Sequence, residues 1–243
     1  MKILCVGDIH GRQFWKRPVE RYLKKVDKII FVGDYFDPYP DDDGIGIPFK
    51  EMLNNFNEIL ELKRENPDKV VLLLGNHDEH YKLSLYKDLA KSTRFDAFHY
   101  HQLRDLFNDN KELFKICHME EVSDKKVYFS HAGITKFWLD FCGIEINDEL
   151  VDNINHLEDS SQGIRCLAVI GKERTWMGEK TGSPLWCDLR EFVKYRGFGE
   201  NTYQIFGHTR LKPGSHVSLK GFTCIDSESC FLLNDKCKLR KVL

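Results

Sequence analysis

No apolar run in the sequence approaches the length of about eighteen residues that a membrane-spanning helix needs. The chain also lacks a C-x-x-C pair, an internal repeat and a low-complexity tract. Charge of one sign is not in excess, because 36 basic residues stand against 38 acidic ones and give a net charge of -2. An overall basic field that would attract nucleic acid or acidic lipid is therefore excluded. These absences predict a soluble, cytoplasmic protein that does not bind a membrane.

The eight cysteines are scattered along a chain that is too long to need a disulfide scaffold. We expect them to be reduced thiols that mostly contribute to packing. A length of 243 residues, with 42% hydrophobic and 30% charged residues, is sufficient for one sizeable α/β domain. No linker divides the chain convincingly, so residues 1–243 are predicted to form a single domain.

Three short apolar runs each end in a glycine followed by polar residues. They are KILCVGDIHG (residues 2–11), KIIFVGDYFD (28–37) and KVVLLLGNHD (69–78). Helical spacing of apolar residues over 49–67, and a shorter candidate helix at 17–25, separate these runs. Strands that alternate with helices indicate parallel pairing, in which the carboxyl ends of the strands gather at one edge of the sheet. The three polar tails are therefore predicted to meet.

The second half of the chain has a different pattern. A charged stretch over 81–116 has helical character, and strand-like runs separated by turns come after it. These runs cover residues 126–133, 202–209, 221–229 and 230–239. The simplest arrangement is a second sheet packed on the first. The acidic segment Asp41–Gly46 is interpreted as a solvated loop, with the binding of a stray cation as the alternative.

Carboxylate, amide and imidazole side chains stand at the predicted strand ends. They are Asp8, His10, Asp34, Asp37, Asn76, His77, Asp78, His131 and His208. Taken singly, each fits an ordinary turn or cap. Together they are too many for one tetrahedral site and indicate two divalent transition metals. Two ions about 3.5 to 4 Å apart can hold a hydroxide and a phosphoryl oxygen for in-line displacement, so the set predicts phosphate ester hydrolysis.

The remaining histidines lack this context and are interpreted as surface or satisfied core residues. They are His80, His99, His101, His118, His156 and His216. Among the strand-end residues, Asp78 is expected to support the turn that carries its neighbours.

Five motifs occur in a fixed order along the chain: GDIHG (7–11), GDYFD (33–37), GNHD (75–78), SHAG (130–133) and GHT (207–209). In this order they resemble the calcineurin-like metallophosphoesterase superfamily, and most closely its bacterial and phage serine/threonine protein phosphatase type. The segment SPLWCD (183–188) before the last motif is also similar to that family. The resemblance spans nearly the whole chain. It implies an α/β four-layer sandwich, in which two mixed β-sheets pack together and are flanked by helices.

The resemblance also implies two sets of metal ligands. They are Asp8, His10 and Asp34 for the first ion, and Asp34, Asn76, His131 and His208 for the second. Asp34 would bridge the two ions. Many relatives have a further ligand in a G-H-x-H motif, but this chain has Arg210 at that position. Water is therefore expected to complete the coordination shell of the first ion.

In the family, the histidine that matches His77 protonates the leaving oxygen and is paired with an aspartate that matches Asp37. A carboxylate partner is expected to raise the pKa of the imidazole and to fix its orientation. Phosphatases of this type also have an arginine in G-D-x-x-D-R-G that holds the substrate phosphate, whereas this chain has Pro38 there. Arg174 in GKERTW resembles the family's other phosphate-binding arginine. The alternative for Arg174 is a surface arginine in a charged loop, and Arg12 is a further candidate.

The predicted activity is therefore that of a metal-dependent phosphomonoesterase that uses two Mn, Fe or Zn ions. The expected substrate is a phosphorylated small molecule, a nucleotide or a phosphoprotein. A phosphodiesterase or dinucleoside polyphosphate hydrolase is the alternative within enzymes, because the phosphate-binding arginine of the G-D-x-x-D-R-G motif is replaced by Pro38. A binding module that has lost the chemistry is the alternative outside them. Nucleic acid is not an expected partner, since no basic stripe with interleaved aromatic residues is visible.

Overall fold

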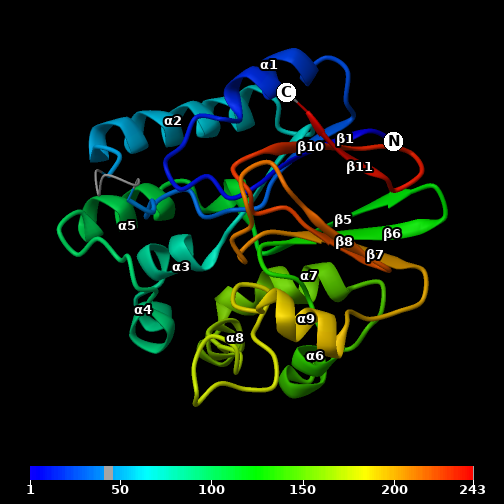
Figure 1. Ribbon diagram of the computed structural model, residues 1–243. Helices are drawn as coiled ribbons and strands as arrows, with labels where there is room; N and C mark the ends of the chain where they lie inside the picture. The colour runs from blue at the N-terminus through cyan, green and yellow to red at the C-terminus, as the bar shows by residue number, and fades with distance from the viewer. Residues whose placement is uncertain (41–45, 243) are drawn as a thin grey trace.

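The computed structural model describes residues 1–40 and 46–242 and contains two β-sheets that pack face to face (Figure 1). The first sheet has six strands in the order β11-β10-β1-β2-β3-β4, and the second has five in the order β5-β6-β7-β9-β8. The strands of the first sheet are β1 (Ile3–Val6), β2 (Lys28–Phe31), β3 (Val70–Leu73), β4 (Phe114–Lys115), β10 (Cys230–Leu233) and β11 (Leu239–Val242). Those of the second are β5 (Cys117–Val122), β6 (Lys125–Ser130), β7 (Thr202–Phe206), β8 (Val217–Leu219) and β9 (Phe222–Cys224).

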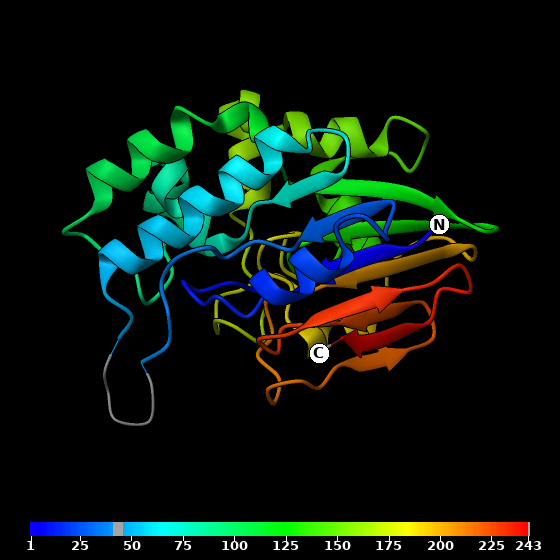
Figure 2. The same cartoon turned by 90° about the horizontal axis from the view of Figure 1, so that it is seen from above.

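Helices lie on both outer sides of the paired sheets, which confirms the predicted four-layer α/β sandwich (Figure 1, Figure 2). On the side of the first sheet they are α1 (Lys16–Tyr22) and α2 (Phe49–Glu65). On the side of the second they are α6 (Lys136–Cys142), α7 (Leu150–Asn155), α8 (Ser161–Leu167) and α9 (Leu189–Tyr195). Between them are α3 (Asn76–Lys82), α4 (Ser84–Ala90), α5 (Tyr100–Asn108) and the short 3-10 helices η1 (Lys111–Leu113) and η2 (His156–Asp159).

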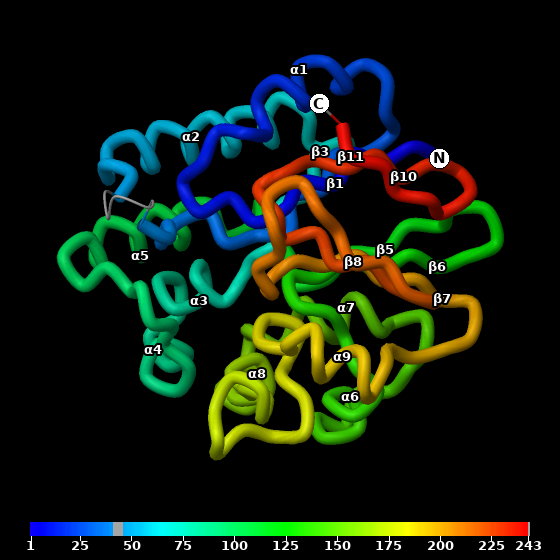
Figure 3. Tube along the Cα trace, in the orientation of Figure 1, coloured from blue at the N-terminus to red at the C-terminus, as the bar shows by residue number. Residues whose placement is uncertain are grey.

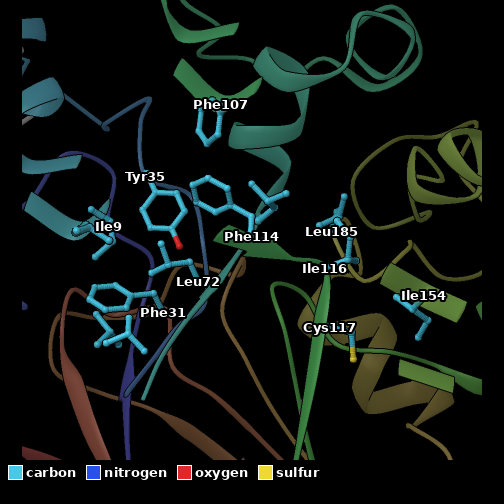
Figure 4. Packing of buried hydrophobic residues seen from close by; sticks show 14 of the residues in the cluster. Ile9, Phe31, Tyr35, Leu72, Phe107, Phe114, Ile116, Cys117, Ile154 and Leu185 are labelled. Atoms are coloured by element: carbon cyan, nitrogen blue, oxygen red, sulfur yellow. The ribbon is translucent and has the colours of Figure 1, made fainter. Parts of the chain in front are cut away.

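The strands β1, β2, β3 and β10 of the first sheet are buried on both faces, because their side chains alternate between two apolar layers. Ile3 and Cys5 of β1 face the second sheet and pack in one cluster with residues such as Phe129. Leu4 and Val6 belong to the cluster that includes the buried residues of α1 and α2. Within that cluster, Figure 4 shows Phe31 and Leu72 together with aromatic residues such as Tyr35 and Phe114. Continuous apolar runs are therefore the correct signature for these strands.

The long helix α2 has the amphipathic spacing predicted from the sequence. Its buried residues are Met52, Asn55, Phe56, Ile59 and Leu60. They recur at three- and four-residue intervals and so form a single face. The ring of Phe56 lies 5.0 Å from Tyr35 and 4.9 Å from Phe36, measured between centroids. This contact anchors the loop after β2, which carries two of the predicted site residues.

The pairing of β1, β2 and β3 is parallel, as predicted. The prediction for the last strand was wrong, because β10 is not in the second sheet but pairs antiparallel with β1. The trace in Figure 3 follows the chain into β10 and β11 beside β1. Local sequence does not distinguish the two sheets, since an apolar strand fits either one and long-range pairing decides between them.

The stretch 81–116 is mostly helical, as expected, but it ends in the short strand β4 beside β3. The strands β5 and β8 were not predicted, and neither was β11, because the sequence pattern indicates one run over residues 230–239. Of the acidic segment that was interpreted as a solvated loop, residues 41–45 lie outside the described residues. All eight cysteines are free thiols, and six of them are buried. No helix in the described part of the chain combines the length and apolarity that crossing a bilayer would require.

Candidate metal centre

The predicted ligands come together at the carboxyl ends of five strands from both sheets. Asp8 and His10 follow β1, and Asp34 follows β2. Asn76 is the first residue of α3, directly after β3. His131 follows β6 and His208 follows β7. All six side chains are buried.

The ligand atoms form two groups that share Asp34. Its Oδ2 lies 3.5 Å from Nε2 of His10 and 3.4 Å from Nε2 of His131. In the second group, Nε2 of His131 lies 3.1 Å from both Oδ1 of Asn76 and Nδ1 of His208. Asp8, His10 and Asp34 lie close enough together to hold one metal ion, and so do Asp34, His131 and His208. A carboxylate shared by two such groups can bridge two ions, so the arrangement suits a dinuclear site.

Backbone carbonyls orient two of the imidazole rings. Nδ1 of His10 donates to the carbonyl of Phe36 at 2.8 Å, and Nδ1 of His131 donates to the carbonyl of Val32 at 2.9 Å. In this tautomer, the free lone pair of each ring is on Nε2, the atom that lies within 3.5 Å of Oδ2 of Asp34. Such a hydrogen bond to the far ring nitrogen is typical of histidines that ligate metals.

Asp8 carries a further sign of a cation site. Its Oδ2 accepts a hydrogen bond from the backbone N–H of His208 at 2.9 Å, but its Oδ1 is buried and has no partner. A buried carboxylate oxygen without a donor is costly, and a bound divalent ion would satisfy it. The residues present therefore fit a pair of divalent cations.

The backbone is strained where these side chains begin. Eight non-glycine residues in the described part of the chain have positive φ, and four of them are predicted site residues. They are His10 (φ 43), Asp34 (φ 54), Asp37 (φ 56) and His208 (φ 65). Non-glycine residues avoid this region unless the surrounding structure holds them there, and such strain concentrates at functional sites.

Glycines in the motifs allow close approach to the carboxylates. A Cβ at Gly75 would lie 2.1 Å from Oδ1 of Asp34, and a Cβ at Gly207 would lie 1.8 Å from Oδ1 of Asp8. Asp78 fixes the same region, because its carboxylate accepts hydrogen bonds from the N–H groups of Gly75, Asp34 and Tyr35 at 2.8, 2.8 and 2.9 Å. Asp78 thus supports the turn, as expected.

Burial favours the neutral form of the side chains that are predicted to bind metal. Burial, with repulsion from Asp226 and Asp34, raises the pKa of Asp8, and burial also raises the pKa of Asp34. Burial lowers the pKa of His10 and His208, and lowers that of His131 to about 3. A cation between these groups would stabilise the carboxylates and use the free imidazole lone pairs. Asp226, after β9, was missed in the sequence although it also stands at a strand end.

His77 and Asp37 are in direct contact beside the ligand groups. Nδ1 of His77 lies 2.8 Å from Oδ2 of Asp37, which also contacts Nε2 of His80 at 2.9 Å. The hydroxyl of Tyr81 donates to the other oxygen of Asp37. Burial acts to raise the pKa of Asp37. Its interactions with His77 and His80 together outweigh burial and lower this pKa to about 2.

Asp37 raises the pKa of His77, as expected, but the net shift of this pKa is downward. Burial lowers this pKa to about 4, and the raising effect of Asp37 is the smaller one. The imidazole is therefore neutral, with its Nδ1 proton directed at Asp37 and its Nε2 lying 3.2 Å from Nη2 of Arg94. The sequence argument considered the charge of the carboxylate and left out the cost of burying the imidazolium.

His80 and Arg94, which lie beside His77, were not predicted as site residues. His80 was interpreted as an ordinary histidine, and it is indeed buried, but it contacts Asp37. Its position three residues after His77 on α3 was the available signal, because residues at that spacing share a helix face. Arg94 lies outside every motif, and no feature of the sequence singled it out.

A pocket of about 310 Å³ opens onto both ligand groups. Its lining includes His10, Asp34, Asn76, His77 and His208 from the predicted site, with Tyr39, Arg94, Arg174 and Trp186 among the other residues. A larger depression of about 660 Å³ beside Arg196 and Phe222 contains none of the predicted site residues. The smaller pocket is therefore the candidate site for substrate binding and hydrolysis.

Arg174 lies at this pocket with a 28% exposed side chain. Its Nε pairs with Asp188 at 3.0 Å, and its Nη2 donates to the carbonyl of His208 at 3.2 Å. Arg12 donates to the carbonyls of His10 and Tyr39, both at 3.3 Å. Arg174 is thus tied to the segment that carries a predicted ligand.

Residues 1–209 match the sequence profile of the calcineurin-like phosphoesterase family, and the chain belongs to that family. No curated protein matches the sequence. Among solved structures, a cold-active protein-tyrosine phosphatase of the psychrophile Shewanella sp. has 17% identity and a TM-score of 0.53, and the match covers 100% of this chain and 80% of that one. A hypothetical protein from Pyrococcus horikoshii OT3 has 8% identity and a TM-score of 0.52, with 99% and 86% covered.

These structural likenesses bear on the fold, and the family supplies the chemistry. The protein is a metal-dependent phosphate ester hydrolase, and its histidine and aspartate groups indicate a dinuclear site for divalent metal ions.

Proposed function

We propose that the protein is a phosphomonoesterase of the serine/threonine phosphatase type with two Mn, Fe or Zn ions. The observation that carries the proposal is the position of Asp34, whose Oδ2 lies within 3.5 Å of Nε2 atoms from both ligand groups. Carboxylate and imidazole ligands suit these three metals alike. The metal ligands in the proposal are Asp8, His10, Asp34, Asn76, His131 and His208.

When bound, the two ions polarise the phosphate ester and make a hydroxide available near neutral pH. The side chains of this protein then have distinct tasks. Asp34 would hold both ions through its carboxylate, and the carbonyls of Phe36 and Val32 fix the rings of His10 and His131 in an orientation that suits ligation. Rigid positioning of this kind reduces reorganisation during the reaction.

His77 is the proposed general acid, and Asp37 is its positioning partner. The hydrogen bond from Nδ1 to Asp37 fixes the ring and leaves Nε2 as the atom available for a proton to the leaving oxygen. A substrate phosphate dianion beside Nε2 would favour the imidazolium, which burial disfavours in the free protein. Arg174 is the proposed contact to the phosphate oxygens at the pocket.

The size of the pocket supports a compact substrate. Its volume of about 310 Å³ is at the lower end of the roughly 300–1,000 Å³ that is usual for small-molecule sites. One phosphoryl group with a short attached side chain or alcohol fits this volume. A phosphorylated serine or threonine, or a small phosphorylated metabolite, is therefore favoured over a bulky diester.

We expect the Mn²⁺-loaded protein to hydrolyse nitrophenyl phosphate with a kcat/KM roughly 10- to 100-fold above that for bis(nitrophenyl) phosphate, the usual worth of one charge-assisted contact. The monoester has terminal charged oxygens for an arginine, and the diester must also place a second aryl group in the pocket. Initial rates with both substrates measure the ratio, with chelated protein as the control.

A faster diester would support the second candidate, a phosphodiesterase or dinucleoside polyphosphate hydrolase. Pro38 is the feature in its favour, because it replaces the arginine that protein phosphatases use to clamp a monoester. No bound transition metal, together with no hydrolysis of either substrate in added Mn²⁺, would instead indicate a binding module.

A further inference from the structure

Arg94 lies in the segment between α4 and α5 and reaches the pocket from outside all five motifs. Three contacts fix its half-buried side chain. Nε donates to the carbonyl of Asp37 at 2.8 Å, and Nη2 lies 3.2 Å from Nε2 of His77. The guanidinium carbon lies 3.5 Å from the ring centroid of Tyr39. The guanidinium is therefore held beside the proposed general acid.

Arg94 is bound by the turn that comes after β2. Its Nε bonds to the carbonyl of Asp37, the residue that directly precedes Pro38. The turn after β2 thus lacks an arginine of its own, but it binds one that comes from another segment. Tyr39 in the same turn provides the aromatic surface on which the guanidinium rests.

Arg94 lacks the direct carboxylate partner that other arginines near the pocket have. Other arginines near the pocket have carboxylate partners: Arg174 pairs with Asp188 at 3.0 Å, and Arg12 pairs with Glu228 at 3.3 Å. Within residues 1–40 and 46–242, no carboxylate lies within ion-pair distance of Arg94, and its Nη1 donates to no acceptor. A cation held in this way in a half-buried pocket attracts an anion.

We propose that Arg94 binds the non-bridging oxygens of a phosphate monoester dianion with its two Nη groups, and that Tyr39 positions it. This inference rests on the proposed function and names the substrate class within it. The planar guanidinium can form two parallel hydrogen bonds to a phosphate, so Arg94 supplies the clamp that Pro38 cannot. Together with Arg174 it selects a doubly charged phosphoryl group.

The kinetic test compares Arg94→Ala and Arg94→Lys with Arg104→Ala, which removes an exposed arginine on α5. Arg94→Ala is expected to raise KM for nitrophenyl phosphate by roughly 10- to 100-fold, the usual worth of a charge-assisted contact. Arg94→Lys is expected to recover part of this loss, because lysine restores the positive charge but cannot form the two parallel hydrogen bonds of a guanidinium. Added guanidinium ion should restore activity to Arg94→Ala. Arg104→Ala is expected to match the wild type.

The binding test does not depend on turnover. Calorimetric titration of inorganic phosphate into the Mn²⁺-loaded proteins should give a Kd that rises in Arg94→Ala as KM does, with unchanged metal content. An unaltered Kd and KM in this variant would overturn the role of Arg94, and so would metal loss, because the defect would then lie in the metal centre. If the wild type instead prefers diesters, the proposed function fails, and the titration still decides whether Arg94 binds phosphate.

Tyr39 is tested as a positioning residue by two variants. Tyr39→Leu removes the aromatic surface and should raise KM several-fold with kcat nearly unchanged. Tyr39→Phe keeps the ring and should restore the wild-type KM. Equal effects of the two substitutions would contradict the stacking role.

Discussion

The Asp34→Asn protein is expected to lose bound metal and to hydrolyse phosphomonoesters slower by on the order of 10³-fold, since several kcal/mol of transition-state stabilisation depend on both ions. Oδ2 of Asp34 lies within 3.5 Å of ligand nitrogens from both groups, so its charge serves both sites. Asparagine has the same shape, and its Oδ1 can still accept the hydrogen bond from the N–H of His77. Metal content and initial rates measure the two losses.

The fold of this variant should be intact, because a buried carboxylate without a cation is costly and the amide removes that cost. We expect the metal-free variant to unfold at a temperature no lower than that of the metal-free wild type. Asp148→Asn, at a 97% exposed carboxylate, is the matched control and should retain metal and activity. Two bound ions with full activity in Asp34→Asn would exclude the bridging role.

The His77→Asn protein is expected to keep both metals but to lose activity by roughly 10² to 10⁴, the usual worth of a positioned general acid. Asn76, not His77, is the proposed ligand, so metal content should not change. The loss should depend on the leaving group, because nitrophenolate departs readily without a proton and a serine alkoxide does not. Rates with a phosphoserine peptide should therefore fall far more than rates with nitrophenyl phosphate.

Asp37→Asn should show the same dependence on the leaving group more mildly, since the ring of His77 would lose only its orienting carboxylate. His101→Asn, at an exposed histidine on α5, is the control and should match the wild type. Equal losses on both substrates, or loss of metal from His77→Asn, would refute the assignment as general acid.

The convergence of the ligands could be predicted because it follows from chain direction. Parallel strands place their carboxyl ends together, so polar residues after β1, β2 and β3 had to meet. His131 and His208 could be added only through the resemblance of their motifs, because nothing local requires β6 and β7 to end at the same edge. The strain at His10 and Asp34 has no sequence signature, since neither residue is a glycine.

Arg94 shows where prediction from the sequence stops. It comes to the pocket through tertiary contacts of a segment without regular structure, and an arginine among the charged residues of 81–116 looks like any solvated one. The membership of β10 in the first sheet was missed for the same reason, because pairing with β1 is a long-range event. The net shift in the pKa of His77 was mispredicted for a different reason. Burial lowers this pKa more than the nearby carboxylate raises it, and the burial is known only from the fold.

The central claim is that two ions share Asp34 and that both are needed to hydrolyse a phosphomonoester. It is tested most directly by titrating Mn²⁺ into the metal-free protein and following the rate of nitrophenyl phosphate hydrolysis. The account predicts that the rate reaches its plateau at two equivalents of Mn²⁺ per chain. A plateau at one equivalent, or hydrolysis that is unaffected by removal of the metal, would contradict it.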